Sequence, residues 1–158
     1  MNASLQRSDV AQQTVFWKQQ IASGPGPFEL STDEPRQPAS SFFREHTALR
    51  LPAERWAAVS AMALASGTDS FAVVLGAFGL VASRHTRQDD LWLGTVALAR
   101  DGDGKEMPNL LALRLGVPGN GTVGAYLSNV QAAIATASAN RDVPFSTVAA
   151  LAGAQPLF

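Results

Sequence analysis

The sequence predicts an α/β (α+β) fold in which helices cover a small mixed sheet. Some segments repeat apolar residues at helical spacing, whereas others alternate or cluster them as strands do. The chain has 158 residues, of which 46% are hydrophobic and 16% charged. This length and composition are typical of one globular domain with a sizeable core. In order, the patterns predict a helix, a connector, a strand, two helices, two strands and two helices.

The first helix is predicted within residues 1–23. Asp9, with Ser8 before it, offers an N-cap, and Gly24 follows as a terminator. Between them, apolar residues recur at helical spacing: Val10, Trp17 and Ile21. Residues 24–41 contain prolines at 25, 27, 35 and 38, a density that blocks regular backbone hydrogen bonding. We expect an extended connector there, followed by the main body of the fold at 42–158.

Three elements are predicted between residues 42 and 84. Residues 42–51 alternate with a period of two, which predicts a strand. Pro52 suits the first turn of a helix that ends at Gly67, with a buried stripe formed by Trp56, Val59 and Ala63. The next helix, 71–84, follows a cap offered by Asp69 and its neighbours. It is apolar all round at first, so we expect it to be covered on several sides.

Two strands and two helices complete the predicted fold. Residues 90–99 cluster apolar side chains, which predicts a strand buried on both faces. Residues 101–104 predict a turn, and residues 110–117 a further strand. Val123 to Ile134 is the most regular amphipathic helix of the chain, and Pro144 opens a last short one that contains Phe145 and Val148.

Charge and composition exclude several classes of function. The net charge is −1, from 12 basic and 13 acidic residues, so neither nucleic acid nor an anionic membrane is expected as a partner. The absence of cysteine excludes disulfide scaffolds, thiolate metal sites and cysteine nucleophiles. Residues 1–13 have no signal-peptide core, and the longest apolar run, 71–82, is shorter than the ~20 residues of a membrane span. A cytoplasmic location is therefore expected.

No self-contained catalytic constellation is visible in the sequence. His46 is predicted within a strand and His85 at the end of an apolar helix, and neither has a ligand at metal spacing. We expect both to be structural or surface residues, so no catalytic, cofactor-binding or metal-binding residue is predicted. No GxSxG elbow occurs, and the adjacent carboxylates of Asp89 and Asp90 point in different directions along a strand.

One glycine pattern matches a dinucleotide-binding fingerprint. Gly119, Gly121 and Gly124 spell GxGxxG between a strand and a helix, and Asp142 follows at about the distance of a ribose ligand. That fingerprint needs its acidic residue at the end of a second parallel strand, whereas Asp142 follows a long helix. We favour a tight turn with helix capping here and keep nucleotide binding as an alternative.

Several segments, taken together and in order, resemble condensation domains of nonribosomal peptide synthetases. Residues 16–21 (FWKQQI) resemble the family's "YWxxxL", and residues 30–36 (LSTDEPR) resemble its "LPTDRPRP". Further matches are QDDLWLGT at 88–95 to "QDDIVVGTP", NLLALR at 109–114 to "NTLPLR", and RDVPF at 141–145 to "HQDVPFE". The family-motif positions are Trp17, Asp33, Pro35, Gln88, Asp89, Asp90, Gly94, Thr95, Asn109, Arg114, Asp142, Pro144 and Phe145.

The resemblance implies a chloramphenicol-acetyltransferase-like half-domain, in which residues 42–158 form part of the second of two lobes. In whole domains of this family the lobes enclose a tunnel that receives the phosphopantetheine arms of carrier proteins. A histidine of an HHxxxDG motif, in the first lobe, assists amide formation there. Epimerisation domains share this architecture. The resemblance also implies a role in secondary-metabolite and antibiotic biosynthesis.

Departures from the family pattern bear on catalytic activity. No HHxxxDG occurs, and the sequence begins where the second lobe begins and stops at a segment that resembles "PLFQV". Asn140 and Ser146 stand where the family has His and Glu around "QDVPF", and residues 105–108 replace the family's "GFFV". These substitutions remove groups that line the tunnel in the family.

The retained motif residues are expected to have structural roles. Asp142 is expected to cap the helix opened by Pro144. Gly94 and Thr95 are expected to end a central strand, where glycine permits close backbone approach. Trp17 is large enough to anchor the first helix.

Together these features predict a truncated, non-catalytic condensation-like domain that acts as a structural and docking platform for neighbouring synthetase domains. A half-domain exposes the face that met its other lobe, and an exposed apolar patch usually marks a partner. The expected partners are an adenylation domain or another synthetase domain, a carrier protein, or a second copy of the chain. No cofactor is expected to bind directly. The alternative is half of a condensation enzyme that a separate N-terminal lobe completes.

Overall fold

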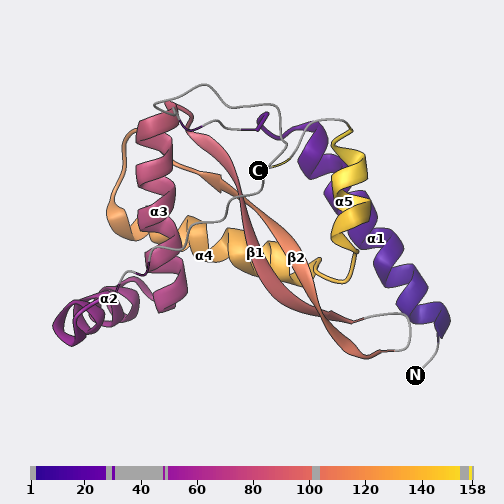
Figure 1. Cartoon of the computed structure of the whole chain (residues 1–158), viewed down its shortest axis with the longest axis horizontal. Coiled ribbons are helices and arrows are strands. Elements are labelled where there is room, and N and C mark those ends of the chain that lie inside the picture. Colours follow the sequence, from indigo (N-terminus) through magenta and orange to yellow (C-terminus); the bar gives the residue numbers. More distant parts are fainter. Residues whose placement is uncertain are drawn as a thin grey trace.

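A computed structural model describes residues 3–27, 30, 48, 50–100, 104–153 and 157. Within these ranges the chain forms α1 (Ala3–Ala22), α2 (Ala53–Ser66), α3 (Ser70–Thr86), β1 (Asp90–Arg100), β2 (Glu106–Gly116), α4 (Val123–Ala139) and α5 (Phe145–Leu151). Figure 1 shows these helices arranged around the two strands. The predicted α/β fold class is confirmed.

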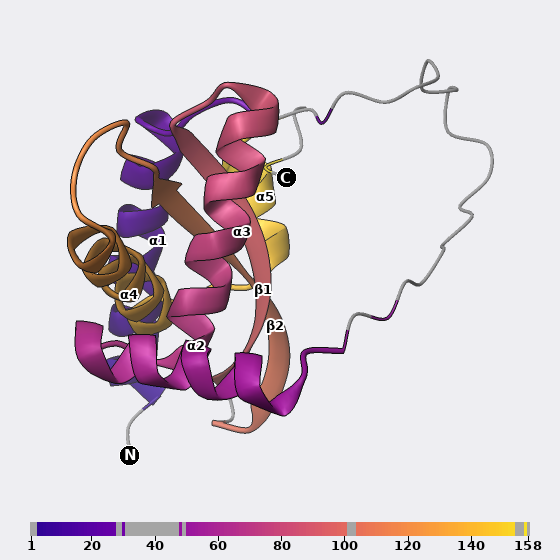
Figure 2. The ribbon, with the colours of Figure 1, turned by 90° about the vertical axis from the view of Figure 1, so that its left-hand side faces the viewer.

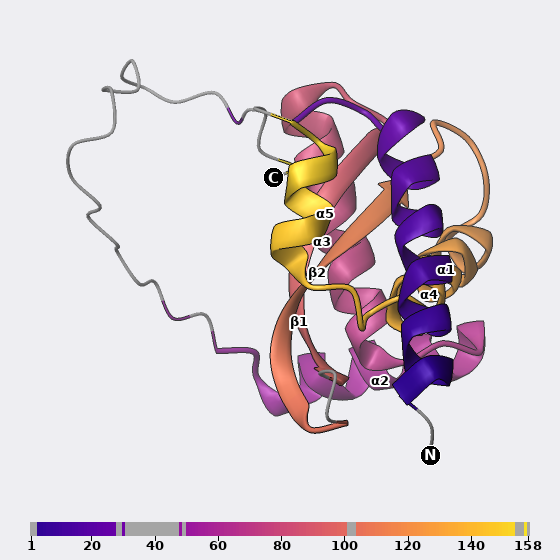
Figure 3. The same ribbon diagram turned by 90° about the vertical axis from the view of Figure 1, so that its right-hand side faces the viewer.

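The small sheet that the sequence predicts consists, in the described part of the chain, of the antiparallel strands β1 and β2. Their register places Leu91 opposite Leu115 and Leu93 opposite Leu113, and all four side chains are buried. Because successive residues of a strand point to opposite faces, these leucines share one face of the β1–β2 ribbon. α4 crosses behind the ribbon in Figure 1, and α1 and α5 pack on each other beside β2 (Figures 1 and 3).

α3 and α4 approach each other closely because α3 carries glycines where they meet. A Cβ atom added at Gly79 would lie 2.9 Å from the Tyr126 hydroxyl and 3.3 Å from Leu115 Cδ1. The Tyr126 hydroxyl instead donates a hydrogen bond of 2.9 Å to the carbonyl oxygen of Gly76. Burial of this phenol raises the pKa of Tyr126 above its ordinary value, because a buried site disfavours the phenolate. Figure 2 shows α3 and α4 adjacent.

Several predicted helix ends are confirmed. Gly67 ends α2 at φ +63°, a left-handed conformation that favours glycine. Asp69 caps α3 by accepting the N–H of Ala72 at 2.7 Å. Pro144 directly precedes α5, as the sequence predicts. α1, by contrast, begins at Ala3, so that Asp9 lies inside the helix; its side chain is exposed, where a polar residue is tolerated without capping.

Three predictions of burial are wrong in whole or in part. Trp56 is 47% exposed, because α2 and α3 meet at a bend of 100° and Trp56 lies in the first turn of α2, whereas Ala63 near its other end is buried. α3 is covered only on the side that faces α4 and the ribbon. Its opposite side leaves Phe78 53% and Val81 55% exposed.

β1 is also not buried on both faces along its whole length. Trp92, Val96 and Leu98 share the face opposite the buried leucines. Trp92 is 1% exposed because the end of α1 and the residues after it cover this face, whereas Val96 and Leu98 are 68% and 56% exposed. Gly94 and Thr95 lie in mid-strand and do not end it, since pairing continues to Arg100 opposite Glu106.

The predicted strand at 42–51 lies mostly outside the described residues. Those of its residues that the structure describes, Ala48, Arg50 and Leu51, adopt no regular structure. The connector predicted at 24–41 is described only at 24–27 and 30, which are also irregular.

No single helix of the described ranges combines the length and apolarity of a membrane span. α2 and α3 reach both only when they are taken together, and the 100° bend separates them.

Candidate functional site

The family-motif residues of β2 and of the segment before α5 meet at Asn109. The Asn109 side chain donates hydrogen bonds to the carbonyl oxygens of Arg141 at 2.9 Å and Val143 at 2.8 Å. Its Oδ1 atom accepts the backbone N–H of Phe145 at 3.0 Å. Asn109 therefore accepts a backbone N–H from the first turn of α5 and fixes the approach to that helix.

Asp142 does not cap α5, so the role predicted for it is wrong. One carboxylate oxygen of Asp142 accepts the backbone N–H of Arg100 at 2.9 Å, and the other accepts Nε2 of Gln13 at 3.2 Å. The backbone N–H of Asp142 donates to Oε1 of Gln13 at 2.9 Å. The Asp142 carboxylate thus joins α1 and the end of β1 to the 140–145 segment. The backbone N–H at the start of α5 is bound by the Asn109 side chain instead.

Trp17 adds a third hydrogen bond between α1 and the 140–145 segment. Its side chain is 2% exposed, and its indole Nε1 donates to the carbonyl oxygen of Asn140 at 2.8 Å. The ring of Phe16 packs edge-on against it, with the ring centroids 5.0 Å apart. Position 140, where the family resemblance has histidine, thus contributes its backbone to the anchoring of α1.

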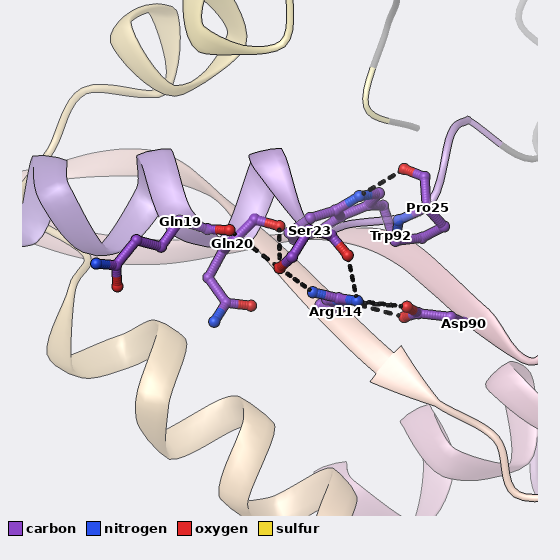
Figure 4. A network of polar contacts seen from close by, with 7 residues as sticks. All are labelled: Gln19, Gln20, Ser23, Pro25, Asp90, Trp92 and Arg114. Atoms are coloured by element: carbon purple, nitrogen blue, oxygen red, sulfur yellow. Dashed lines mark hydrogen bonds and ion pairs between the residues drawn. The ribbon is translucent and has the colours of Figure 1, made fainter.

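A second junction joins the end of α1 to the opposite end of the ribbon (Figure 4). The Arg114 guanidinium contacts both carboxylate oxygens of Asp90, with Nη2 2.7 Å from Oδ2 and Nε 3.1 Å from Oδ1. The same guanidinium donates to the carbonyl oxygen of Ser23 at 2.7 Å and to its hydroxyl at 3.0 Å. The hydrogen bond and the charge of Asp90 raise the pKa of Arg114, so the side chain stays cationic.

Trp92 closes the same junction from the strand side. Its Nε1 atom donates to the carbonyl oxygen of Pro25 at 3.1 Å (Figure 4). Gly24 permits this contact, because a Cβ atom there would lie 2.7 Å from Cζ2 of Trp92. A pocket of about 260 Å³ lies beside the indole, and its lining has no titratable side chain among the described residues: Ile21, Gly24, Pro25, Gly26, Pro27, Trp92, Ala152 and Leu157.

The remaining motif residues are dispersed. Asp89 accepts a hydrogen bond from the Ser83 hydroxyl of α3 at 3.4 Å, whereas the adjacent Asp90 binds Arg114. The two neighbouring carboxylates therefore point in different directions. Gln88 lies in the turn before β1, where its backbone N–H donates to the Thr86 hydroxyl at 3.3 Å. Asp33 and Pro35 lie outside the described residues.

The candidate catalytic and nucleotide-binding residues do not converge. His85 is exposed in the last turn of α3, and His46 lies outside the described residues. No three His, Asp or Glu side chains of the described ranges gather as metal ligands. The GxGxxG segment forms a loop that runs into the first turn of α4, where Gly124 lies. Thr122 caps α4 by accepting the N–H of Ala125 at 3.2 Å. Gly121 has φ +135°, which favours glycine, and Asp142 follows α4 rather than a second strand.

The arrangement brings together motif residues that are far apart in the sequence, and it also uses residues that sequence reasoning missed. Gln13, Ser23 and Arg100 complete the two junctions through side-chain and backbone bonds. None of them belongs to a recognisable motif. Arg100 contributes its backbone N–H, which any residue except proline has, so the residue type gives no sign of this role. Chemically, the junctions hold elements in place. Outside the junctions, large apolar side chains are exposed on the ribbon, on the outer side of α3 and on α2: Val96, Leu98, Phe78, Val81, Trp56, Met62 and Leu64.

Comparison with known proteins gives the family and the extent of the match. The model of the Condensation domain family matches residues 1–156. Malpibaldin synthetase of Mortierella alpina is 33% identical over 145 residues, which are 89% of this chain and 3% of that protein. Chondramide synthase of Chondromyces crocatus is 30% identical over 146 residues, 89% of this chain and 4% of that protein.

Solved structures share the fold over nearly the whole chain. The X-domain from teicoplanin biosynthesis superposes with a TM-score of 0.78 at 25% identity, over 90% of this chain and 33% of that one. The first condensation domain of the CDA synthetase gives a TM-score of 0.79 at 20% identity, over 98% of this chain and 36% of that one. The chain thus spans about a third of the length of these structures.

Proposed function

Because this chain belongs to the condensation domain family and spans about a third of its solved relatives, we propose that it is a non-catalytic lobe that docks other synthetase domains. The open half of the ribbon face carries this proposal. Val96 and Leu98 are 68% and 56% exposed, although Trp92 on the same face is 1% exposed. Apolar side chains in a row on a strand face are the usual mark of a surface that is covered in an assembly.

The rigid junctions support a role as a platform. Asn109, Asp142 and Arg114 use their polar groups to fix α1 and α5 to the ribbon. A docking surface gains affinity when it is preformed, because little conformational freedom is lost on binding. A solved structure that pairs the X-domain from teicoplanin biosynthesis with OxyB shares 26% identity with this chain and a TM-score of 0.79. We therefore expect the partner to be a protein domain: an adenylation domain, another synthetase domain or a carrier protein with its phosphopantetheine arm.

Calorimetric titration tests this function. The chain is titrated with an adenylation domain and with a loaded carrier protein from a synthetase, and binding is expected to one of them. Val96→Glu combined with Leu98→Glu is expected to abolish binding, since it places two charges in the docking face. Leu64→Glu is the matched control, because Leu64 is 83% exposed on α2, away from the ribbon. Peptide-bond formation by this chain alone from loaded carrier proteins would overturn the non-catalytic part of the proposal.

The alternative function is half of a condensation enzyme that a separate first lobe completes. Its support is the similarity to the first condensation domain of the CDA synthetase, with a TM-score of 0.79. The chain covers 36% of that domain, so a second polypeptide would supply the rest. This alternative predicts amide formation only when the chain is mixed with a polypeptide that carries HHxxxDG. Binding without amide formation in that mixture favours the platform over the enzyme.

A further inference from the structure

The outer side of α3 carries an apolar seam that the platform function does not use. We define the α3 seam as Phe71, Val74, Phe78, Val81 and His85. The first four are 46%, 43%, 53% and 55% exposed, and His85 is exposed as well. No charged residue occurs between Phe71 and Ala82. α3 lies on one side of the ribbon, and α1 and α5 lie on the other (Figure 1).

The spacing of the α3 seam is that of a surface which receives another helix. Its members follow one another by three, four, three and four residues, the repeat that forms the contact line of two packed helices. The side of α3 that faces α4 is fixed by its close approach at Gly76 and Gly79. The α3 seam is therefore held in a defined orientation and presents a ready knobs-into-holes surface.

The order of residues along the α3 seam fits a second copy in antiparallel orientation. With Phe78 on a two-fold axis, Val74 lies opposite Val81 of the other copy, and Phe71 lies opposite its His85. Like side chains then meet at the centre, as an isologous interface requires. His85 offers an imidazole to the face of an aromatic ring at each end.

The charges at the two ends of α3 favour the same orientation. The N-terminal end carries Asp69, whereas the C-terminal end carries Arg84, His85 and Arg87, all with exposed side chains. Antiparallel pairing brings the acidic end of one helix toward the basic end of the other, and parallel pairing sets like charges side by side. We propose that two copies of this chain associate through the α3 seam in antiparallel orientation, with Phe78 at the two-fold axis.

Analytical ultracentrifugation of the 158-residue chain over a range of concentrations tests the association. A monomer–dimer equilibrium is expected, and Phe78→Glu is expected to raise the dissociation constant by about 30-fold or more, because it alters the centre of both contributing surfaces. Leu64→Glu on α2 and Val96→Glu on the ribbon are controls that leave the dimer unchanged. The second control also separates this proposal from the docking function, which depends on Val96.

Site-specific crosslinking tests the orientation, since the chain contains no cysteine of its own. Phe78→Cys is expected to form a disulfide-linked dimer. Val74→Cys and Val81→Cys are expected to crosslink efficiently only when the two variants are mixed, because antiparallel pairing sets position 74 of one copy against position 81 of the other. Circular dichroism confirms that each variant folds.

Three results overturn the proposal. One is a monomer at every concentration. Another is a pair of variants at 74 and 81 that each crosslink with themselves as readily as with each other. The third is crosslinking of Leu64→Cys at the rate of Phe78→Cys, which shows unspecific association through exposed apolar residues.

Discussion

Asn109 of β2 accepts the backbone N–H of Phe145 at 3.0 Å, although 36 residues separate the two in sequence. The same side chain holds the carbonyl oxygens of Arg141 and Val143. A single amide therefore supplies both donors and an acceptor to the backbone that leads into α5. The Asn109–Phe145 bond makes the start of α5 dependent on the ribbon.

Removal of this amide is expected to destabilise the chain. Asn109→Ala removes three hydrogen bonds to backbone groups in a part-buried setting, so we expect a loss of about 2–3 kcal/mol in the free energy of unfolding. Urea denaturation followed by circular dichroism measures it. Asn120→Ala is the matched control, because Asn120 is exposed in the loop before α4. Equal stability of the two variants would show that the Asn109 bonds contribute nothing.

Gly24 and Gly26 provide a matched pair for the second junction. A Cβ atom at Gly24 would lie 2.7 Å from Cζ2 of Trp92 and 2.9 Å from the carbonyl oxygen of Gln20, whereas one at Gly26 meets nothing within 4 Å. Gly24→Ala is expected to cost about 1–3 kcal/mol through overpacking. Gly26→Ala is expected to change stability by less than about 1 kcal/mol. Thermal unfolding of both variants, followed by circular dichroism, compares them; a Gly24→Ala variant as stable as Gly26→Ala contradicts the close contact.

Because the phenol of Tyr126 is buried, we expect the free energy of unfolding to fall in alkaline solution. Burial raises its pKa in the folded chain above the ordinary value of 10.0. The unfolded state therefore ionises first, so the contribution of Tyr126 is fully present below 10.0 and is lost as the pH rises from there through the pKa of the folded chain. Tyr126→Phe is expected to flatten this alkaline loss, at a cost of about 1 kcal/mol at neutral pH for the hydrogen bond to Gly76.

The alkaline prediction has a direct spectroscopic check. Tyr126 is the single tyrosine of the chain, so the ultraviolet absorbance of tyrosinate reports its ionisation alone. The folded chain is expected to titrate above the denatured chain. A folded chain that titrates at or below the value of the denatured one would contradict the burial of the phenol.

Arg114 is expected to be poorly replaced by lysine. Its guanidinium reaches both oxygens of Asp90 and both oxygens of Ser23, and a single ammonium cannot keep this fork geometry. Because the side chains of Arg114 and Asp90 are 27% and 38% exposed, solvent screens the pair, and we expect Arg114→Lys to cost only about 1 kcal/mol. Arg55→Lys, at an exposed position on α2, is the control in urea denaturation. A loss several times larger would indicate a buried pair.

The elements of the fold that depend on local pattern could be predicted from the sequence. The start of α5 at Pro144 and the ends set by Gly67 and Asp69 follow from backbone preferences that act over a few residues. The burial of Trp56, Val96 and Leu98 could not be predicted in this way. Periodicity shows which face a side chain lies on, but only the neighbours decide whether that face is covered.

In the candidate site, too, the sequence indicated which residues matter but not which contacts they make. The resemblance to a family singled out Asn109 and Asp142, but not what they do. A carboxylate close to the start of a helix is a common cap, but Pro144 is itself the N-cap residue of α5, and the packing of α1 brings Gln13 to Asp142 instead. No motif marks Gln13, since a glutamine on a helix is usually solvated.

The bond between Gln13 and Asp142 spans 129 positions of sequence, and it carries a consequence for biosynthesis. A growing polypeptide emerges with its N-terminus first, so α1 leaves the ribosome long before its binding site on the 140–145 segment exists. The indole of Trp17, which binds the carbonyl oxygen of Asn140 in the folded chain, stays exposed to solvent or bound by a chaperone during that interval. The hairpin of β1 and β2 closes over a short loop and can form earlier. Although α1 is synthesised before the other described elements, it is therefore among the last of them to be fixed in place.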